Sequence, residues 1–133
     1  MQPRPKVTIC GSFKRAPQQL AELFLELETT GCRVLSPLSL NFTNHKEPFV
    51  KLSSEVDFSI LEIEKFHLRA IAESDFIWLH CPDGYIGLSG AFELGYALAL
   101  HKPIYSNATP TDITLAQLVT KVNSVFSALK NIC

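Results

Sequence analysis

Residues 75–106 read DFIWLHCPDGYIGLSGAFELGYALALHKPIYS, and this stretch decides the fold. It begins with an apolar run at 76–79, long enough for one buried strand of a parallel sheet. A loop rich in turn-forming residues follows at 81–90, and small residues mark a helix over 91–100. Another strand begins at 104–106. Such a strand–loop–helix–strand unit places ligands where the loop leaves the carboxyl end of the first strand.

Glu93 is the only acidic side chain in the expected helix. Ser89 is a natural N-cap, which would put Glu93 in the first turn or just past it, where the helix dipole favours a carboxylate. A glutamate there is commonly a solvated surface residue. Here the glycine-rich loop and the small neighbours favour a functional carboxylate that a ligand can approach. These neighbours are Gly90, Ala91, Gly95 and Ala97.

The composition sets the class of protein. The chain has 133 residues, 47% of them hydrophobic and 19% charged, which predicts a single domain over 1–133 with one well-filled interior. A net charge of -1 gives no electrostatic reason to expect a nucleic acid polymer or an anionic membrane as partner. We find no run of membrane-spanning length and no signal peptide, and we therefore expect a soluble, cytoplasmic protein.

The spacing of cysteine and histidine residues indicates no metal site. The four cysteines contain no Cys-x-x-Cys pair, and the four histidines form no His-x-x-x-His set. Cys10 and Cys81 both follow expected strands, so they could lie near each other, although two reduced thiols are the simpler interpretation. From the sequence we expect neither a metal nor a cofactor.

Strands and helices alternate along the rest of the chain. Strands are expected at 7–10 and 33–36, helices at 18–30 and 58–74, and a last helix that begins at Thr111 or Asp112 and carries apolar residues to Leu129. The stretch 38–57 has no sustained period, and a loop of this length is often a lid. Its Phe42 and Phe49 either close over a ligand or pack into the core; the sequence leaves both open.

This alternation predicts an α/β fold of three layers, with helices on both faces of a doubly wound parallel sheet. The expected strand order is near 2-1-3-4, with the switch point between the first and third strands. The turn at 11–13 and the loop at 82–89 then meet in one crevice, and Glu93 lies at the expected ligand site.

The crevice suits a small polar ligand, because two glycine-bearing loops direct backbone N–H groups toward it. The loop lacks the Gly-Lys-Ser/Thr ending of a Walker motif and does not match the Gly-x-Gly-x-x-Gly spacing of dinucleotide-binding loops, and no Gly-x-Ser-x-Gly elbow makes Ser89 a nucleophile. The candidate chemistry is a carboxylate in a partly dry pocket. Such a group acts as a nucleophile at sugar anomeric carbons, where the transition state is positively charged.

The motif DGYIGxSxxFELGYAxA at 83–99, followed by KPIYS, resembles the signature of the nucleoside 2-deoxyribosyltransferase-like family, and the early Gly-Ser-Phe at 11–13 is consistent with it. The resemblance implies a flavodoxin-like fold and a homo-oligomer whose sites are often completed by a neighbouring subunit. It also implies that Glu93 is the nucleophile. In that family this glutamate attacks the anomeric carbon of a deoxynucleoside and forms a covalent deoxyribosyl-enzyme, from which a second base, or water in hydrolases, takes the sugar.

The sequence departs from the family at three positions. His67 and Gly87 stand where related transferases have carboxylates, and residues 7–10 contain no counterpart of the tyrosine that orients the nucleophile. Asp83 or His67 is therefore the candidate for the acid that protonates the leaving base. We expect the substrate to be bound by Gly11, Ser12, Phe13, Asp75, Gly84, Tyr85, Gly87 and Ser89.

Three functions follow from these observations. The first is N-glycosyl transfer or hydrolysis on a small-molecule nucleoside or nucleotide through Glu93. The alternative, motivated by Gly87, is a nucleotide- or sugar-binding module without catalysis. The third is a structural or interaction protein.

Overall fold

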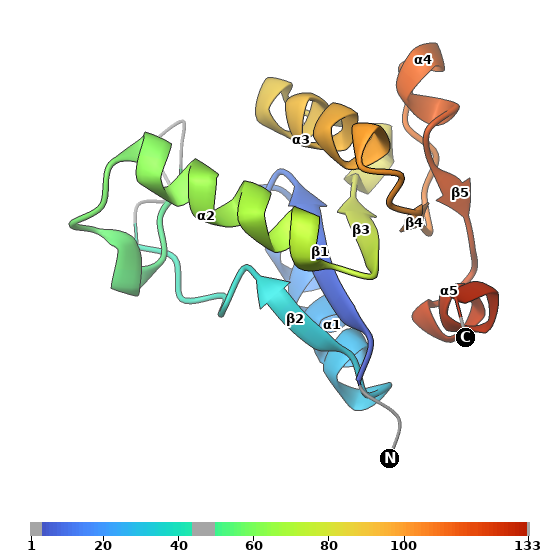
Figure 1. Ribbon diagram of the computed structural model, residues 1–133, viewed down its shortest axis with the longest axis horizontal. Helices are drawn as coiled ribbons and strands as arrows, with labels where there is room; N and C mark the ends of the chain where they lie inside the picture. Colours follow the sequence, from blue (N-terminus) through green and yellow to red (C-terminus); the bar gives the residue numbers. More distant parts are fainter. Residues whose placement is uncertain (1–3, 44–49, 133) are drawn as a thin grey trace.

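Five parallel strands form one sheet in the order β2-β1-β3-β4-β5 within residues 4–43 and 50–132, which the computed structural model describes (Figure 1). The strands are β1 (Lys6–Gly11), β2 (Arg33–Ser36), β3 (Phe76–His80), β4 (Ile104–Ser106) and β5 (Thr120–Lys121). The helices are α1 (Pro17–Thr29), α2 (Ile60–Glu73), α3 (Leu88–Ala99), α4 (Ile113–Ala116) and α5 (Val125–Ile132), with the short 3-10 turns η1 (Ser53–Glu55) and η2 (Pro82–Gly84). None of the helices in these ranges has the length and apolar character needed to cross a lipid bilayer.

Helices cover both faces of the sheet, as the strand–helix alternation predicts. Helices α1 and α5 pack on one face, where Val7 and Ile9 of β1 join their apolar residues in one core. Helices α2 and α3 pack on the other face over a second core that includes Cys10. Because side chains alternate along a strand, Val7 and Ile9 point to α1 whereas Cys10 points to α2 and α3. The predicted three-layer α/β class is confirmed, and the expected strand order near 2-1-3-4 is confirmed with β5 added at its edge.

The prediction of one long helix at the end of the chain is wrong. This segment forms α4, then β5, then α5. Thr120 and Lys121 pair with Tyr105 and Ser106 of β4, and the Val122 amide donates to the Ser106 carbonyl at 2.9 Å. The β-branched residues of this segment suit a strand, and without β5 the backbone groups of β4 would be unpaired at the sheet edge.

The start of α3 also differs from the prediction. Gly87, not Ser89, is the N-cap residue, and no side chain caps the helix. Because α3 begins at Leu88, Glu93 lies in its second turn, two residues deeper than the position in or just past the first turn that a Ser89 cap would give. The backbone of Glu93 is therefore held inside the helix and does not depend on the geometry of the cap.

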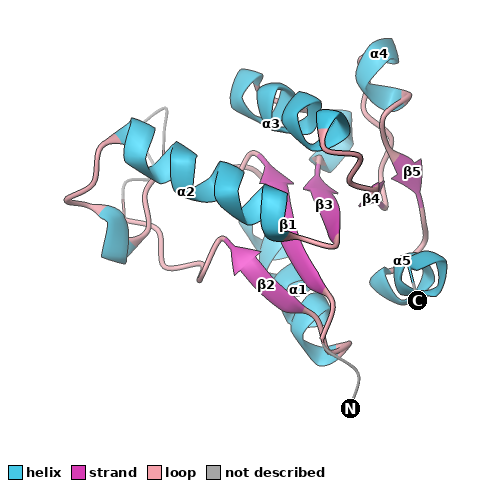
Figure 2. Cartoon of the chain, viewed as in Figure 1, coloured by secondary structure: helices cyan, strands magenta, loops and turns pink. Residues whose placement is uncertain are grey.

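The segment between β2 and α2 is mostly loop apart from η1 (Figure 2). Phe42 forms an isolated antiparallel bridge with Leu52, and its ring lies 5.8 Å from that of Phe13 between centroids. Phe42 packs against the α1-side core, which was one of its two expected roles, and also lines the cavity described below; closure over a ligand stays a prediction. Phe49, the other aromatic residue of this stretch, lies outside the described residues.

Candidate active site

A cavity of about 650 Å³ opens at the carboxyl edge of the sheet, next to the ends of β1 and β2. The turn after β1 lines it with Gly11, Ser12 and Phe13, and the loop before α3 lines it with Tyr85, Gly87 and Ser89. The predicted meeting of these two loops in one crevice is therefore seen in the structure. Helix α2 closes the cavity on another side, because Ile63, Glu64 and His67 line it as well.

Gly11 allows the first loop to turn directly beside β3. Its φ is +126°, and a Cβ atom built there would lie 2.1 Å from the His80 carbonyl oxygen, so no side chain fits. Beyond the turn, the His80 Nε2 atom lies 2.7 Å from the Arg15 carbonyl oxygen. The Arg15 guanidinium in turn stacks 3.5 Å from the centre of the Tyr85 ring. These contacts hold the two loops together at the cavity wall.

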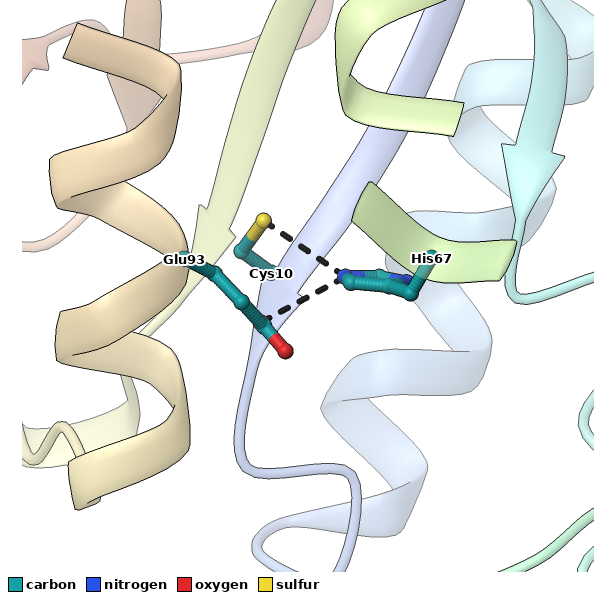
Figure 3. Close-up of side chains that lie close together, drawn as sticks. All are labelled: Cys10, His67 and Glu93. Atoms are coloured by element: carbon teal, nitrogen blue, oxygen red, sulfur yellow. Dashed lines mark hydrogen bonds and ion pairs between the residues drawn. The ribbon is translucent and has the colours of Figure 1, made fainter. Parts of the chain in front are cut away.

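Three buried side chains from three elements meet inside the cavity region (Figure 3). Glu93 comes from α3, His67 from α2 and Cys10 from β1, and Glu93 and His67 are each 5% exposed. His67 Nε2 lies 3.4 Å from Glu93 Oε1 and 3.7 Å from Cys10 Sγ. The other ring nitrogen, Nδ1, shares a hydrogen bond of 2.6 Å with the Ser36 hydroxyl. The imidazole is therefore held at both nitrogens and is fixed beside the Glu93 carboxylate.

Glu64 lies next to this group and has an unusual electrostatic environment. Burial raises its pKa to about 7, and the hydrogen bond and negative charge of Glu93 act in the same direction, whereas His67 acts against them. Its Oε1 atom is buried and has no hydrogen-bond partner within the described part of the chain. A carboxyl group with such a pKa is partly protonated at neutral pH, so it can donate a proton to a bound molecule.

The thiol of Cys10 is unreactive on its own. Burial raises the pKa of its thiol well above the ordinary value of 9.0, and the nearby charges of Glu93 and Glu64 raise it further. Since the thiolate is the reactive form, a neutral thiol in this position is a poor nucleophile.

Eight of the predicted site residues lie around this cavity, and three do not line it. Asp75 directly precedes β3 at the opposite edge of the sheet, where its Oδ2 accepts a hydrogen bond from the Lys6 amide at 2.8 Å. Asp83 is exposed in η2, and Gly84 is buried there with its carbonyl accepting from the Thr111 amide at 3.0 Å. These three residues lie outside the lining of this cavity, and the roles of Asp83 as acid and of Asp75 and Gly84 in substrate binding stay predictions.

The sequence interpretation missed Glu64, Ser36 and Cys10 as members of the site. The sequence did contain a signal for Glu64, because this residue lies three positions before His67 and therefore on the same face of the expected helix. Ser36 and Cys10 lie at or near the carboxyl ends of two expected strands, but only the strand register and the helix positions bring them to His67. The tertiary structure also brings together a set of possible metal ligands. Cys10, His67 and Glu93 could hold an ion, because their ligand atoms lie within 4.8 Å of one another.

The fold has a counterpart among solved structures. No model of a known protein family matches the chain, and no curated protein matches its sequence. In structure, the chain is similar to the CMP N-glycosidase BcmB of Clostridium botulinum, with a TM-score of 0.58 over 95% of each chain. The two sequences are 17% identical, so this likeness establishes a shared fold.

Proposed function

We propose that the protein cleaves or transfers the N-glycosidic bond of a nucleoside or nucleotide, with Glu93 as the nucleophile. One observation carries the proposal: a buried carboxylate at the carboxyl edge of the sheet borders a cavity that also contains a second, proton-holding carboxyl group. Enzymes that cleave glycosidic bonds usually use two carboxyl groups, whose different environments give them different roles. The similarity to an enzyme described as a CMP N-glycosidase supports the same class of reaction.

In the first step a Glu93 carboxylate oxygen attacks the anomeric carbon, C1′, of the sugar. The bond between C1′ and the base nitrogen breaks, and its electron pair leaves with the base. Glu64 donates its proton to the base, so the base departs neutral and the sugar is left as an ester on Glu93. His67, held by Ser36 and placed 3.4 Å from Glu93 Oε1, orients the attacking carboxylate.

In the second step water or another base attacks C1′ from the open side of the cavity. The ester bond to Glu93 breaks, the carboxylate is restored, and Glu64, now ionised, accepts the proton that the incoming group loses. Water gives hydrolysis, and a second base gives transfer. Glu64 thereby supplies the acid that the sequence lacks at Gly87.

The cavity rim fits a nucleotide better than a bare nucleoside. Lys14 and Arg15 line the cavity beside the Ser12 and Gly11 backbone, and their positive charges favour a 5′-phosphate. Phe13 and Tyr85 line the same cavity with aromatic rings that a base can stack upon. CMP, the molecule in the name of the similar glycosidase, has a pyrimidine base and a phosphate, and it belongs in any substrate panel.

The test is an assay of base release from ribo- and deoxyribonucleosides and their monophosphates, with and without an acceptor base. The unaltered protein is expected to release free base, and Glu93→Gln to lower the rate by about 10³-fold or more, since it removes the nucleophile. Mass spectrometry of the stopped reaction should find a sugar ester on Glu93. Glu73→Gln, at the exposed end of α2, is the matched control and should leave the rate unchanged.

Full activity of Glu93→Gln would eliminate the proposal. The second candidate, a binding module without catalysis, is favoured by one observation, the glycine at position 87 where related transferases have a carboxylate. Saturable binding of nucleotides by the unaltered protein, without release of base from any member of the panel, would select it.

A further inference from the structure

We propose that Cys10, His67 and Glu93 form a binding site for Zn²⁺ or a similar divalent transition-metal ion. The three residues offer one sulfur, one nitrogen and one oxygen atom from three different elements, and all three side chains are buried. Figure 3 shows the Cys10 thiol and the Glu93 carboxylate both next to the same ring nitrogen of His67, with the three side chains coming from β1, α3 and α2. Sulfur, imidazole and carboxylate are the three ligand types that zinc accepts in proteins.

The spacing of the ligand atoms fits one tetrahedral ion. With bonds of about 2.3 Å to sulfur and about 2.0–2.2 Å to nitrogen and oxygen, tetrahedral angles put a nitrogen about 3.4 Å from an oxygen and about 3.6 Å from a sulfur. His67 Nε2 lies 3.4 Å from Glu93 Oε1 and 3.7 Å from Cys10 Sγ. The third pair lies within 4.8 Å, so a small rotation of either side chain completes the set.

The surroundings of the three ligands are those of a metal centre. Ser36 Oγ shares a hydrogen bond of 2.6 Å with His67 Nδ1, which leaves Nε2 as the atom that faces the ion. Metal-bound histidines usually have such an outer-shell partner on their other ring nitrogen. Two of the three ligands, His67 and Glu93, line the cavity, and Glu64 lines it as well, so water from the cavity can supply a fourth ligand. Three protein ligands and one water are the arrangement of catalytic rather than structural zinc sites.

Binding joins the sulfur to the metal and releases the thiol proton of Cys10 to solvent. The thiolate and the carboxylate then carry two negative charges, which the divalent ion balances inside the protein. This charge balance explains how an otherwise neutral buried thiol becomes a ligand.

The ion and the nucleotide would compete for Glu93. Its carboxylate cannot coordinate a metal and attack C1′ at the same time, so bound Zn²⁺ blocks the reaction described above. This consequence rests on the proposed function, whereas the metal site itself does not.

Cobalt(II) provides a direct test of the site, because tetrahedral Co²⁺ bound to a thiolate has a charge-transfer band in the near ultraviolet and intense visible bands. Titration of the whole chain with Co²⁺ is expected to reach one ion per chain, and Zn²⁺ should displace it. Cys10→Ser should remove the charge-transfer band and weaken Zn²⁺ binding, measured by calorimetry, by more than the roughly 10-fold to 100-fold that loss of an outer-shell partner costs, because Cys10 is itself a ligand. Cys81→Ser, a buried cysteine of another strand end, is the matched control.

Glu93→Gln provides a second variant that keeps the cysteine, and it should weaken Zn²⁺ binding while the thiolate band with Co²⁺ persists. Urea unfolding of each variant checks that it is folded. The site is refuted if the folded unaltered protein shows no saturable binding of one ion, or if Cys81→Ser loses as much affinity as Cys10→Ser. Zinc binding in a protein that releases no base would support the site and reject the proposed function, so the two failures are distinguishable.

Discussion

Glu64 and Glu93 face the same cavity, but their surroundings assign them different tasks. The raised pKa of Glu64 comes first from burial and then from Glu93, so the proton on Glu64 depends on the presence of the second carboxylate. Two neighbouring carboxyl groups cannot easily carry both negative charges, and one of them retains a proton. This coupling makes Glu64 an acid next to a nucleophile, although His67 beside them opposes the rise in the Glu64 pKa.

Glu64→Gln should slow base release by about 10²-fold to 10⁴-fold on natural nucleotides, the usual contribution of a general acid. The glutamine is nearly isosteric and can still donate a hydrogen bond, but it cannot give up a proton. A substrate whose leaving group departs without protonation should lose much less, and the ratio of kcat/KM for the two substrates measures the effect. An equal loss on both substrates would show that Glu64 acts in some other way.

His80 should make the stability of the fold depend on pH. Burial lowers its pKa below the ordinary value of 6.5, although the hydrogen bond to the Arg15 carbonyl opposes this. The folded state therefore prefers the neutral imidazole, and the unfolded chain binds the proton first. The stabilisation is complete above the unfolded pKa of 6.5 and is lost as the pH falls through the lower folded pKa.

The measurement is the free energy of unfolding in urea at pH about 7.5 and at pH about 5.5, on either side of the ordinary histidine pKa. His80→Gln keeps a side-chain donor for the Arg15 carbonyl but does not titrate, so its unfolding free energy should fall less on acidification than that of the unaltered protein. Identical pH profiles for the two proteins would contradict this account.

At the scale of elements, the turn between β1 and α1 forms part of the cavity wall, and its position depends on its contact with β3. Gly11 pairs with His80 of β3 and lies close enough to its carbonyl to exclude any side chain. Gly31, at the end of α1, also has a positive φ, +92°, but nothing lies within 4 Å of an added Cβ. The two glycines separate the effect of backbone conformation from the effect of a steric clash.

Gly31→Ala should lower the free energy of unfolding by about 1–2 kcal/mol, the cost of a left-handed backbone for an ordinary residue. Gly11→Ala should cost clearly more, because β1 and β3 must move apart as well. Urea unfolding of the two variants measures the difference, and soluble yield replaces it should Gly11→Ala fail to fold. Equal losses would mean that the neighbouring strand yields to the methyl group.

Helix α2 delivers two members of the site at once. Glu64 and His67 lie on its cavity-facing side, and its amino end is fixed by a capping box in which Ser59 Oγ accepts from the Glu62 amide and Glu62 Oε1 accepts from the Ser59 amide, each at 3.1 Å. Any change that rotates this helix would move the acid and the imidazole together relative to Glu93.

At the scale of the whole molecule, α2 and α3 lie on one side of the sheet and expose apolar side chains there (Figure 1). Leu61 is 61% exposed on α2, and Phe92 and Leu98 are 56% and 48% exposed on α3. The family resemblance predicts a homo-oligomer, and these side chains suit a contact between copies of the chain.

Light scattering of the purified protein should therefore give a mass of at least two chains. Phe92→Lys should shift the mass toward one chain, because a charge buried in an apolar contact is costly. Leu25→Lys is the matched control, since Leu25 is 61% exposed on α1 at the other face of the sheet and should not alter the mass. A single-chain mass for the unaltered protein would remove the oligomer prediction.

The sequence alone determined the layered fold, the place of the cavity and the position of Glu93. These depend on local patterns: apolar runs mark strands, helical spacing marks helices, and parallel sheets place their ligands at the carboxyl edge. Local pattern was not sufficient at 111–129, where the apolar spacing fits a helix but the open edge of β4 selects a strand. Nor did it identify the helix cap, where Gly87 rather than Ser89 precedes α3.

Only the tertiary structure decided which residues surround Glu93. Cys10, Ser36, Glu64 and His67 come from three different elements, and no spacing along the chain relates the first two to the others. Asp83 is ten residues from Glu93 in sequence but exposed outside the cavity, whereas Glu64 is distant in sequence and lies half-buried beside Glu93. Proton affinity and metal-binding geometry depend on burial and on distances between side chains, and these exist only once the helices are packed against the sheet.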